Sequence, residues 1–180
     1  MTEDRSGGQP DIPRFEAVVL PHLDAAFNLA RWLTHDDQEA EEIVQEAFVR
    51  ALRFFAGYRG GDAKAWLLAI VRNTCYDRVR RERSDGMTTE FDEEVHGVDR
   101  VEVGPEVSLL IAEDARAVSR ALEELPVEFR EALVLREIEG LSYKEISGVT
   151  GLPLGTVMSR LARARRRMQI RLAGGQRKEG

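Results

Sequence analysis

The segment that most constrains the fold is residues 141–161, LSYKEISGVTGLPLGTVMSRL. Ser142 and Glu145 have the spacing of a capping box, which predicts that a helix begins there. Gly151 can adopt the left-handed backbone conformation that ends a helix, and Pro153 prevents that helix from continuing through the turn. Apolar residues recur at helical spacing on both sides of this turn. The segment therefore predicts a helix-turn-helix.

The second helix of this pair carries residues suited to DNA recognition. It begins at Gly155 or Thr156, and Val157 and Leu161 are spaced to dock on the first helix. The polar and basic residues expected to face outward are Thr156, Ser159, Arg160, Arg163 and Arg166. In a helix-turn-helix, such residues meet base edges in the major groove, and basic neighbours contact phosphates. The alternative is an ordinary helical hairpin with a solvated basic face.

The rest of this second block, residues 107–172, also has helical spacing. Val118, Leu122 and Leu125 form a stripe on one helix. Pro126 suits the first turn of the next helix, which Gly140 ends. The apolar positions of that helix are Phe129, Leu133, Val134 and Ile138. The second block is thus predicted to be a small helical domain.

Residues 12–83 predict a first helical domain. Pro21 should kink or split its first helix, and Asp36 with Glu39 forms a second capping box. The stripe that follows consists of Ile43, Ala47, Ala51 and Phe55, flanked by Val44, Phe48 and Leu52. A glycine-rich loop comes next, and Asp62 can cap the helix after it, with Trp66 facing inward. The inward neighbours of Trp66 are Leu67, Ile70 and Val71.

The charge distribution suggests what joins the two domains. The net charge is −6 and the sequence pI is about 5.3, but basic residues concentrate near 78–83 and 160–171. A phosphate backbone responds to a local basic face and not to the total charge. Residues 84–106 between these ends are mostly acidic and lack a sustained period, which predicts a flexible linker. A hairpin through 95–103 is the alternative.

These features predict an all-α chain of two small helical domains, with loose ends at 1–11 and 173–180. No apolar run approaches roughly 20 residues, and the N-terminus lacks a signal-peptide pattern, so we expect a cytoplasmic protein without membrane insertion. The single cysteine, Cys75, is expected in the core, with redox sensing as the alternative. No nucleophile–base set, phosphate loop or metal-ligand spacing is present, so we expect no enzyme, cofactor, metal or small-molecule substrate.

Three segments resemble the sigma-70 family, in its extracytoplasmic function (ECF) subfamily, and the resemblance extends over residues 15–172. They are residues 37–52, DQEAEEIVQEAFVRAL; residues 65–81, AWLLAIVRNTCYDRVRR; and Leu125-Pro126 followed by the helix-turn-helix and residues 159–165, SRLARAR. The resemblance implies a sigma factor that binds RNA polymerase core, melts promoter DNA and initiates transcription. The resemblance also implies that an anti-sigma factor is a partner and that the protein acts in a stress response.

The resemblance also implies roles for single residues. Glu42, Gln45 and Glu46 would dock on the polymerase, whose β′ clamp and β subunit are the expected contacts. The loop residues Tyr58 and Arg59 would help to open DNA at the minus-ten element. The residues of the next helix expected to join them are Arg72, Asn73, Tyr76 and Arg80. Stacking of a freed base on an aromatic or cationic side chain contributes about 1–3 kcal/mol.

The helix-turn-helix would then recognise the minus-thirty-five element, and the acidic linker would enter the polymerase channel that normally holds nucleic acid. Without the resemblance, the charged face of 37–52 is as well explained by solvation, and Trp66 is better explained as a core residue than as a DNA contact. Two other functions stay open from the residues: a helix-turn-helix regulator that binds duplex DNA without polymerase core, and a helical protein-interaction adaptor.

Overall fold

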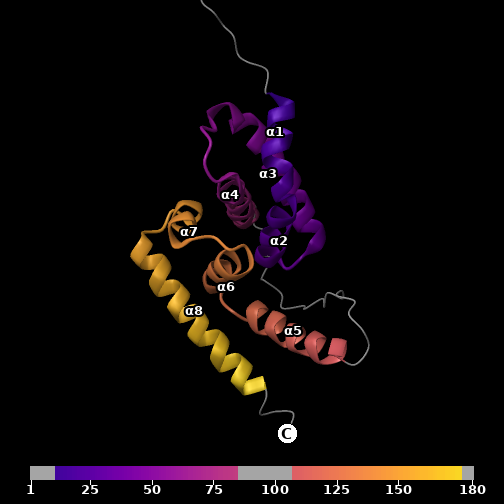
Figure 1. Ribbon diagram of the computed structural model, residues 1–180, viewed down its shortest axis with the longest axis vertical. Helices are drawn as coiled ribbons and strands as arrows, with labels where there is room; N and C mark the ends of the chain where they lie inside the picture. Colours follow the sequence, from indigo (N-terminus) through magenta and orange to yellow (C-terminus); the bar gives the residue numbers. More distant parts are fainter. Residues whose placement is uncertain (1–10, 85–106, 176–180) are drawn as a thin grey trace, which may run out of the picture.

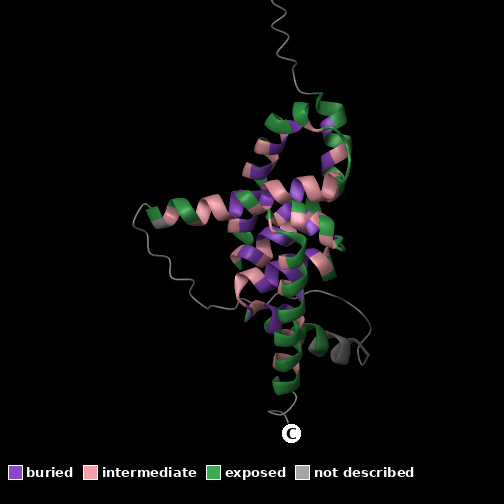
Figure 2. Ribbon diagram, turned by 90° about the vertical axis from the view of Figure 1, so that its left-hand side faces the viewer, coloured by how far each residue is buried: buried purple, intermediate pink, exposed green. Residues whose placement is uncertain are grey.

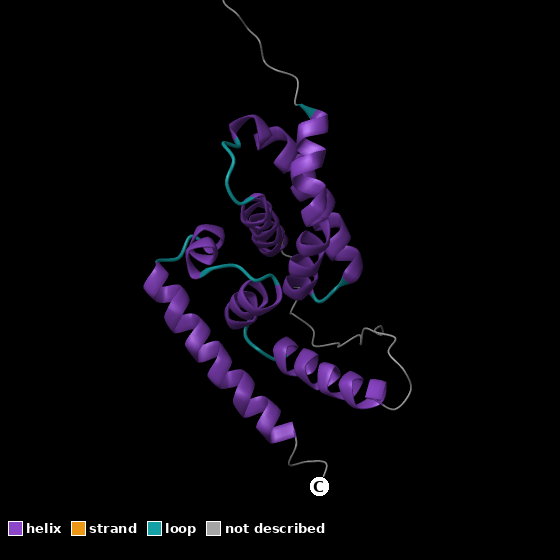
Figure 3. Cartoon of the chain, viewed as in Figure 1, coloured by secondary structure: helices purple, strands orange, loops and turns teal. Residues whose placement is uncertain are grey.

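The computed structural model describes residues 11–84 and 107–175, except the side chains of Arg83, 107–113 and Gly175. Every regular element in these two ranges is a helix, which confirms the predicted all-α class (Figure 3). The proposed linker lies outside the described residues from position 85 onward. The first block holds α1 (Ile12–Val19), the short helix η1 (Leu20–His22), α2 (Leu23–Thr34), α3 (Asp37–Phe54), η2 (Phe55–Gly57) and α4 (Ala63–Ser84). The second block holds α5 (Val107–Glu123), α6 (Val127–Leu133), the π-helical turn η3 (Val134–Ile138), α7 (Tyr143–Thr150) and α8 (Leu154–Gly175).

The helix boundaries of the first block follow local signals in the sequence. Pro21 lies in the 3₁₀ turn η1, which separates α1 from α2 as expected. Asp36 caps α3 by accepting a hydrogen bond from the backbone N–H of Glu39 at 2.8 Å. The reciprocal half of the expected capping box does not form: the Asp36 N–H donates to Thr34 Oγ1 at 3.3 Å, and the Glu39 carboxylate lies 3.5 Å from Arg78 of α4. Asp62 caps α4 through the N–H of Ala65 at 2.7 Å.

The first block is built around apolar side chains of α2, α3 and α4. Leu29, Ile43, Leu67, Leu68 and Val71 are completely buried. Full burial of such a side chain stabilises the fold by about 1.5–3 kcal/mol. The stripe expected from the sequence, Ile43, Ala47, Ala51 and Phe55, is buried at all four positions, which confirms its helical spacing.

The second block contains the predicted helix-turn-helix. Ser142 and Glu145 exchange both capping-box hydrogen bonds, at 3.2 and 2.6 Å. Gly151 ends α7 with a left-handed φ of 71°, and α8 begins at Leu154, one residue before the expected start. Val157 and Leu161 are buried against the rest of the block. The turn and its supporting contacts are therefore as the local sequence predicts.

Three expectations for the second block were wrong. Val118 is 44% exposed, and among residues 114–123 of α5 the buried side chains are Ala121 and Leu122. Ile138 is 48% exposed because the end of the α6 region widens into the π-helical turn η3, which changes the angular position of each residue. α8 continues to Gly175, three residues beyond the expected end at 172.

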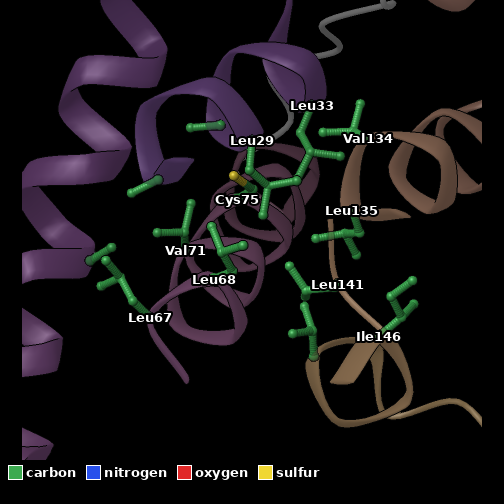
Figure 4. Packing of buried hydrophobic residues seen from close by; sticks show 14 of the residues in the cluster. Leu29, Leu33, Leu67, Leu68, Val71, Cys75, Val134, Leu135, Leu141 and Ile146 are labelled. Carbon is green, nitrogen blue, oxygen red and sulfur yellow. The ribbon is translucent and has the colours of Figure 1, made fainter. Parts of the chain in front are cut away.

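The two blocks pack against each other through α2 and α4 on one side and α6, η3 and α7 on the other (Figure 1). Figure 4 shows Leu29 and Leu33 of α2 close to Val134 and Leu135, and Leu68 of α4 facing Leu141. The buried side chains form one cluster that extends over both blocks. Figure 2 shows buried positions concentrated where the blocks meet and exposed positions along the distal part of α8.

Candidate nucleic-acid and polymerase interfaces

The first turns of α8 present one face to solvent. Val157, Leu161 and Ala164 form the buried side of the helix. Ser159 and Arg163 are exposed on the other side, and so is Arg166. The guanidinium of Arg163 lies 5.9 Å from the ring centroid of Phe129, and its Nε donates to the Ser159 carbonyl at 3.3 Å. These contacts hold a cationic side chain beside the exposed face without burying it.

Two of the five expected groove residues are less accessible than their spacing suggested. Thr156 and Arg160 are half-buried, because both lie at the edge of the arc that packs on the second block. Arg160 is close enough to α4 and α6 for its charge to oppose part of the rise that burial causes in the pKa of Tyr76 and of Glu131. Arg160 therefore lies near the contact between α4 and α6, and the expectation that it faces outward holds only in part.

The exposed face of α8 also includes apolar residues that sequence reasoning missed. Leu154 is 47% exposed and Met158, one turn later, is 51% exposed. Their apolar character favoured a core position, and no pattern in the sequence separated them from Val157. The available signal is angular: at about 100° per residue, Met158 lies about 100° from Val157 and about 60° from Leu161, beyond the edge of the buried line.

The expected minus-ten residues of α4 divide into covered and open positions. Arg72 donates through Nε to Oε1 of Glu131 in α6 at 2.6 Å, and its guanidinium lies 4.4 Å from the ring centroid of Tyr76. Glu131 is 1% exposed. Asn73 and Arg80 are exposed. Most of the four were expected to share one helical face, and contact with Glu131 of α6 leaves Arg72 and Tyr76 half-buried.

Burial at this contact changes two ionisation equilibria. Burial raises the pKa of Tyr76 to about 12, and the nearby Glu131 carboxylate raises it further while Arg72 opposes the change. Burial also raises the pKa of Glu131, and the charge and hydrogen bond of Arg72 work against that rise. The phenol of Tyr76 is therefore neutral at physiological pH and can donate a hydrogen bond.

The glycine-rich loop holds Tyr58 and leaves Arg59 exposed. The Tyr58 hydroxyl donates to the Gly61 carbonyl at 2.9 Å, and its ring stacks on Phe55 at 5.7 Å between centroids. The Tyr58 and Trp66 rings are 5.0 Å apart. The Arg59 side chain is exposed to solvent. Trp66 packs against the core, which confirms its predicted structural position.

The expected polymerase-docking residues lie on the outer side of α3, where α4 supplies cations. Glu42 pairs with Arg78 at 2.7 Å. Glu46 pairs with Arg50 at 2.7 Å and with Arg81 at 3.2 Å. Gln45 is exposed. The face is therefore a ladder of ion pairs and not a bare acidic surface.

Other chemistry is scarce among residues 11–84 and 107–175. No group of three His, Cys, Asp or Glu side chains there has the arrangement of a metal site. Cys75 is 4% exposed, and burial raises the pKa of its thiol to about 12, which confirms the predicted core position. No helix of this part of the chain is long and apolar enough to cross a membrane.

Comparison with known proteins places these surfaces in a family. Residues 18–84 match the family model for sigma-70 region 2, and residues 115–168 match the model for sigma-70 region 4. The first match covers α2, α3 and α4, which carry the ion-pair ladder and the minus-ten candidates. The second covers most of α5 and the helix-turn-helix.

Curated relatives agree. The ECF RNA polymerase sigma factor SigE of Mycolicibacterium smegmatis is 36% identical over 176 residues, which cover 94% of this chain and 66% of that protein. The sigma-H factor of Pseudomonas aeruginosa is 38% identical, and the ECF sigma-E factor of Escherichia coli is 37% identical. Both alignments cover 86% of this chain and 84% of the relative. The chain thus spans about two thirds of one relative and most of the other two.

Solved structures show the same fold. The sigma factor RpoE, from its complex with the anti-sigma factor NepR of Bartonella quintana, matches with a TM-score of 0.74 and 29% identity, over 89% of this chain and 97% of that one. CnrH, from its complex with the cytosolic domain of CnrY, matches with a TM-score of 0.62 and 24% identity, over 94% and 92%. Family models, relatives and fold together show that this chain belongs to the sigma-70 family of RNA polymerase sigma factors, with ECF members as its relatives, and is a transcription initiation factor and not an enzyme.

Proposed function

We propose that this chain binds RNA polymerase core through α3 and directs it to promoters, with α8 reading the minus-thirty-five element and the Tyr58 loop and α4 engaging the minus-ten element. The observation that carries this proposal is the exposed face of α8, held on a capped and correctly turned helix-turn-helix. A recognition helix needs its first turns free while its opposite side is anchored.

At the minus-thirty-five element, Ser159 and Arg163 are the main base-reading candidates, and Arg166 contacts phosphate. Arginine can form two hydrogen bonds with guanine, and serine serves either a base or a phosphate. Met158 adds an exposed apolar group in the same turn of α8, suited to the 5-methyl group of thymine. Thr156 and Arg160 serve at the edge of the contact, because both are half-buried.

At the minus-ten element, the accessible groups are Arg59, Asn73 and Arg80. Tyr58 supplies a ring at the loop, where a freed base can stack once its contact with Phe55 loosens. Arg72 and Tyr76 join this set when α6 moves away. Unstacking a base costs a few kcal/mol, so several such groups must act together.

Docking on polymerase is assigned to the outer face of α3. Gln45 is exposed and can donate and accept hydrogen bonds, while Glu42 and Glu46 present carboxylates whose positions are fixed by Arg78 and Arg81. Because Glu42 and Glu46 are already paired with arginines, this face offers polymerase carboxylates in fixed positions but little net charge. Exposed ion pairs contribute little to stability, so they can be exchanged for partner contacts at low cost.

An anti-sigma factor is the second partner that we propose. The support is that the structures of RpoE and CnrH were solved as complexes with NepR and CnrY. We also place the chain in the cytoplasm, where it would meet polymerase and DNA. The acidic linker, residues 84–106, is proposed to enter the polymerase channel as a mimic of nucleic acid.

The test is in vitro transcription with purified polymerase core on a promoter library. Adding the chain should yield transcripts from a defined subset of promoters. The double variant Gln45→Ala, Glu46→Ala should weaken core binding and leave the helical circular dichroism spectrum unchanged. A chain that gives neither promoter-specific transcripts nor a stable complex with core is not acting as a sigma factor.

The rival function is a helix-turn-helix regulator that binds duplex promoter DNA alone. High affinity for duplex DNA, with no increase when polymerase core is added, would favour this rival function.

A further inference from the structure

The contact between the two blocks has an apolar centre and two polar ends. At one end, Arg72 of α4 meets Glu131 of α6. At the other end, Oε1 of Glu139 accepts from Asn28 of α2 at 2.6 Å, and its Oε2 lies 2.8 Å from Nζ of Lys64 of α4. The Lys64 ammonium also donates to the Glu139 backbone carbonyl at 2.8 Å. The carboxylates of Glu131 and Glu139 in the second block thus accept hydrogen bonds from side chains of the first block.

Both carboxylates are shielded from water. Glu131 is 1% exposed, and the side chain of Glu139, just before the turn into α7, is 6% exposed. Removing a carboxylate from water is costly, and the cost is offset only where hydrogen-bonded cations satisfy it. Separating the blocks would rehydrate all of these groups, so the ion pairs favour one arrangement of the blocks more than they add net stability.

The donors at these two ends are the kinds of group that bind nucleic acid. An arginine guanidinium binds a carboxylate and a phosphate with the same forked geometry, and lysine and asparagine donate readily to phosphate oxygens. Arg72 also stacks on Tyr76, an arrangement in which either side chain could receive a base. Glu131 therefore takes up the Arg72 donors that a phosphate could otherwise accept from.

We propose that the second block is a built-in competitor of DNA: Glu131 and Glu139 hold this block against α4 through Arg72 and Lys64, and Arg72 and Tyr76 engage the minus-ten strand only after the blocks separate. This inference rests on the DNA-binding role proposed above for Arg72 and Tyr76. It adds that the free chain withholds this surface while the face of α8 stays open.

The size of the effect follows from the population of open chains. The apparent affinity of a ligand is reduced by the fraction of the protein that is competent to bind it. If about 1% of free chains are open, single-stranded DNA binds about 100-fold more weakly than it would to the open form. Weakening the lock should recover part of that factor.

The test uses the full chain with Glu131→Gln and Glu139→Gln together. The matched control is Glu124→Gln with Glu137→Gln, which removes the same charge from ion pairs with Arg171 and Arg165 inside the second block. Fluorophores on Ala17→Cys and Gln169→Cys, both exposed positions, report the separation of the blocks by energy transfer. Cys75 is buried and needs no replacement.

A fluorescent single-stranded oligonucleotide of minus-ten sequence, taken from promoters selected with polymerase core, reports DNA binding. The lock variant should show lower energy transfer and at least about tenfold tighter oligonucleotide binding than the control variant. Adding Arg72→Ala and Tyr76→Ala should abolish the gain.

Unchanged energy transfer in the lock variant would overturn the lock and leave the sigma function standing. Lower energy transfer without tighter DNA binding would show that the blocks open but do not compete with DNA, which would also count against the minus-ten role of Arg72 and Tyr76.

Discussion

The chain has two basic surfaces that look alike in sequence and differ in the folded protein. The first turns of α8 carry arginines on the side that faces solvent, and the opposite side of the helix is buried. The middle of α4 carries Arg72 under a buried carboxylate of the other block. Both surfaces are rich in arginine, and both belong to segments that match sigma-70 regions. The difference is the partner that each surface already has.

This contrast shows that basic charge identifies a surface suited to DNA but not its state. An arginine with a solvated face is available at once, whereas an arginine paired with a buried glutamate must first lose that partner. The two surfaces can therefore act in order: α8 is open from the start, and α4 becomes available after the blocks separate.

The largest effect is expected from removing the support behind the open surface. Leu161 is completely buried beneath α8, so Leu161→Ala should lower the free energy of unfolding by about 2–5 kcal/mol. Met158→Ala on the exposed side should change it by less than about 0.5 kcal/mol. Urea unfolding followed by circular dichroism checks both. Equal reductions for the two variants would show that α8 is anchored by a different side.

A smaller effect is expected on DNA affinity. The double change Arg163→Ala, Arg166→Ala should weaken binding of core-bound chain to minus-thirty-five duplex by roughly tenfold or more. It should also reduce the salt dependence, by about one unit of log–log slope for each phosphate that an arginine no longer neutralises. Arg72→Ala, in the covered surface, should leave that slope unchanged. Titrations at several salt concentrations make the comparison. A slope that falls with Arg72→Ala and not with the α8 pair would reverse the assignment.

The covered surface should also show in the ionisation of Tyr76. Burial raises the pKa of this phenol from 10 to about 12, so the unfolded chain loses its proton first as pH rises. The stability from the neutral phenol is complete below pH 10 and is lost as pH rises through about 12. The phenolate absorbance of wild type minus Tyr76→Phe isolates this group. Opening the lock with Glu131→Gln, Glu139→Gln should move the pKa back toward 10, and no movement would mean that α6 is not the cause.

The smallest effect concerns base reading by Met158. One buried methyl group contributes about 0.8 kcal/mol, which is about a fourfold change in affinity. Replacing thymines of the minus-thirty-five element by uracil, one at a time, should weaken wild-type binding by about this factor at one position. The Met158→Ala variant should be insensitive to that replacement. A variant that stays as sensitive as wild type would assign the methyl contact to another side chain.

The sequence predicted what depends on neighbours along the chain. The capping box of Ser142 and Glu145, the left-handed Gly151 and the split at Pro21 are each set by residues that are close together in sequence. Buried stripes were also predictable where a helix has one clear apolar side. The prediction for Val118 failed because an apolar residue of a helix can extend beyond the surface that its partners cover.

The contacts that cover α4 could not be predicted in the same way. Arg72 and Glu131 are 59 residues apart, and Lys64 and Glu139 are 75 apart, so only the packing of two domains brings them together. Each of these residues alone resembles a solvated charge. The same reason explains Arg160, whose half-buried position depends on where the first block sits. The surfaces suited to DNA could be identified from the sequence, but which of them is covered could not.

Interblock energy transfer on polymerase binding reports whether the two surfaces become available in order. The chain carrying fluorophores on Ala17→Cys and Gln169→Cys is measured alone and then with a saturating amount of polymerase core, without DNA. The account predicts high energy transfer in the free chain and a clear fall when core binds, because Arg72 must lose Glu131 before it meets the minus-ten strand. High energy transfer that persists in a core complex active in transcription would contradict the account.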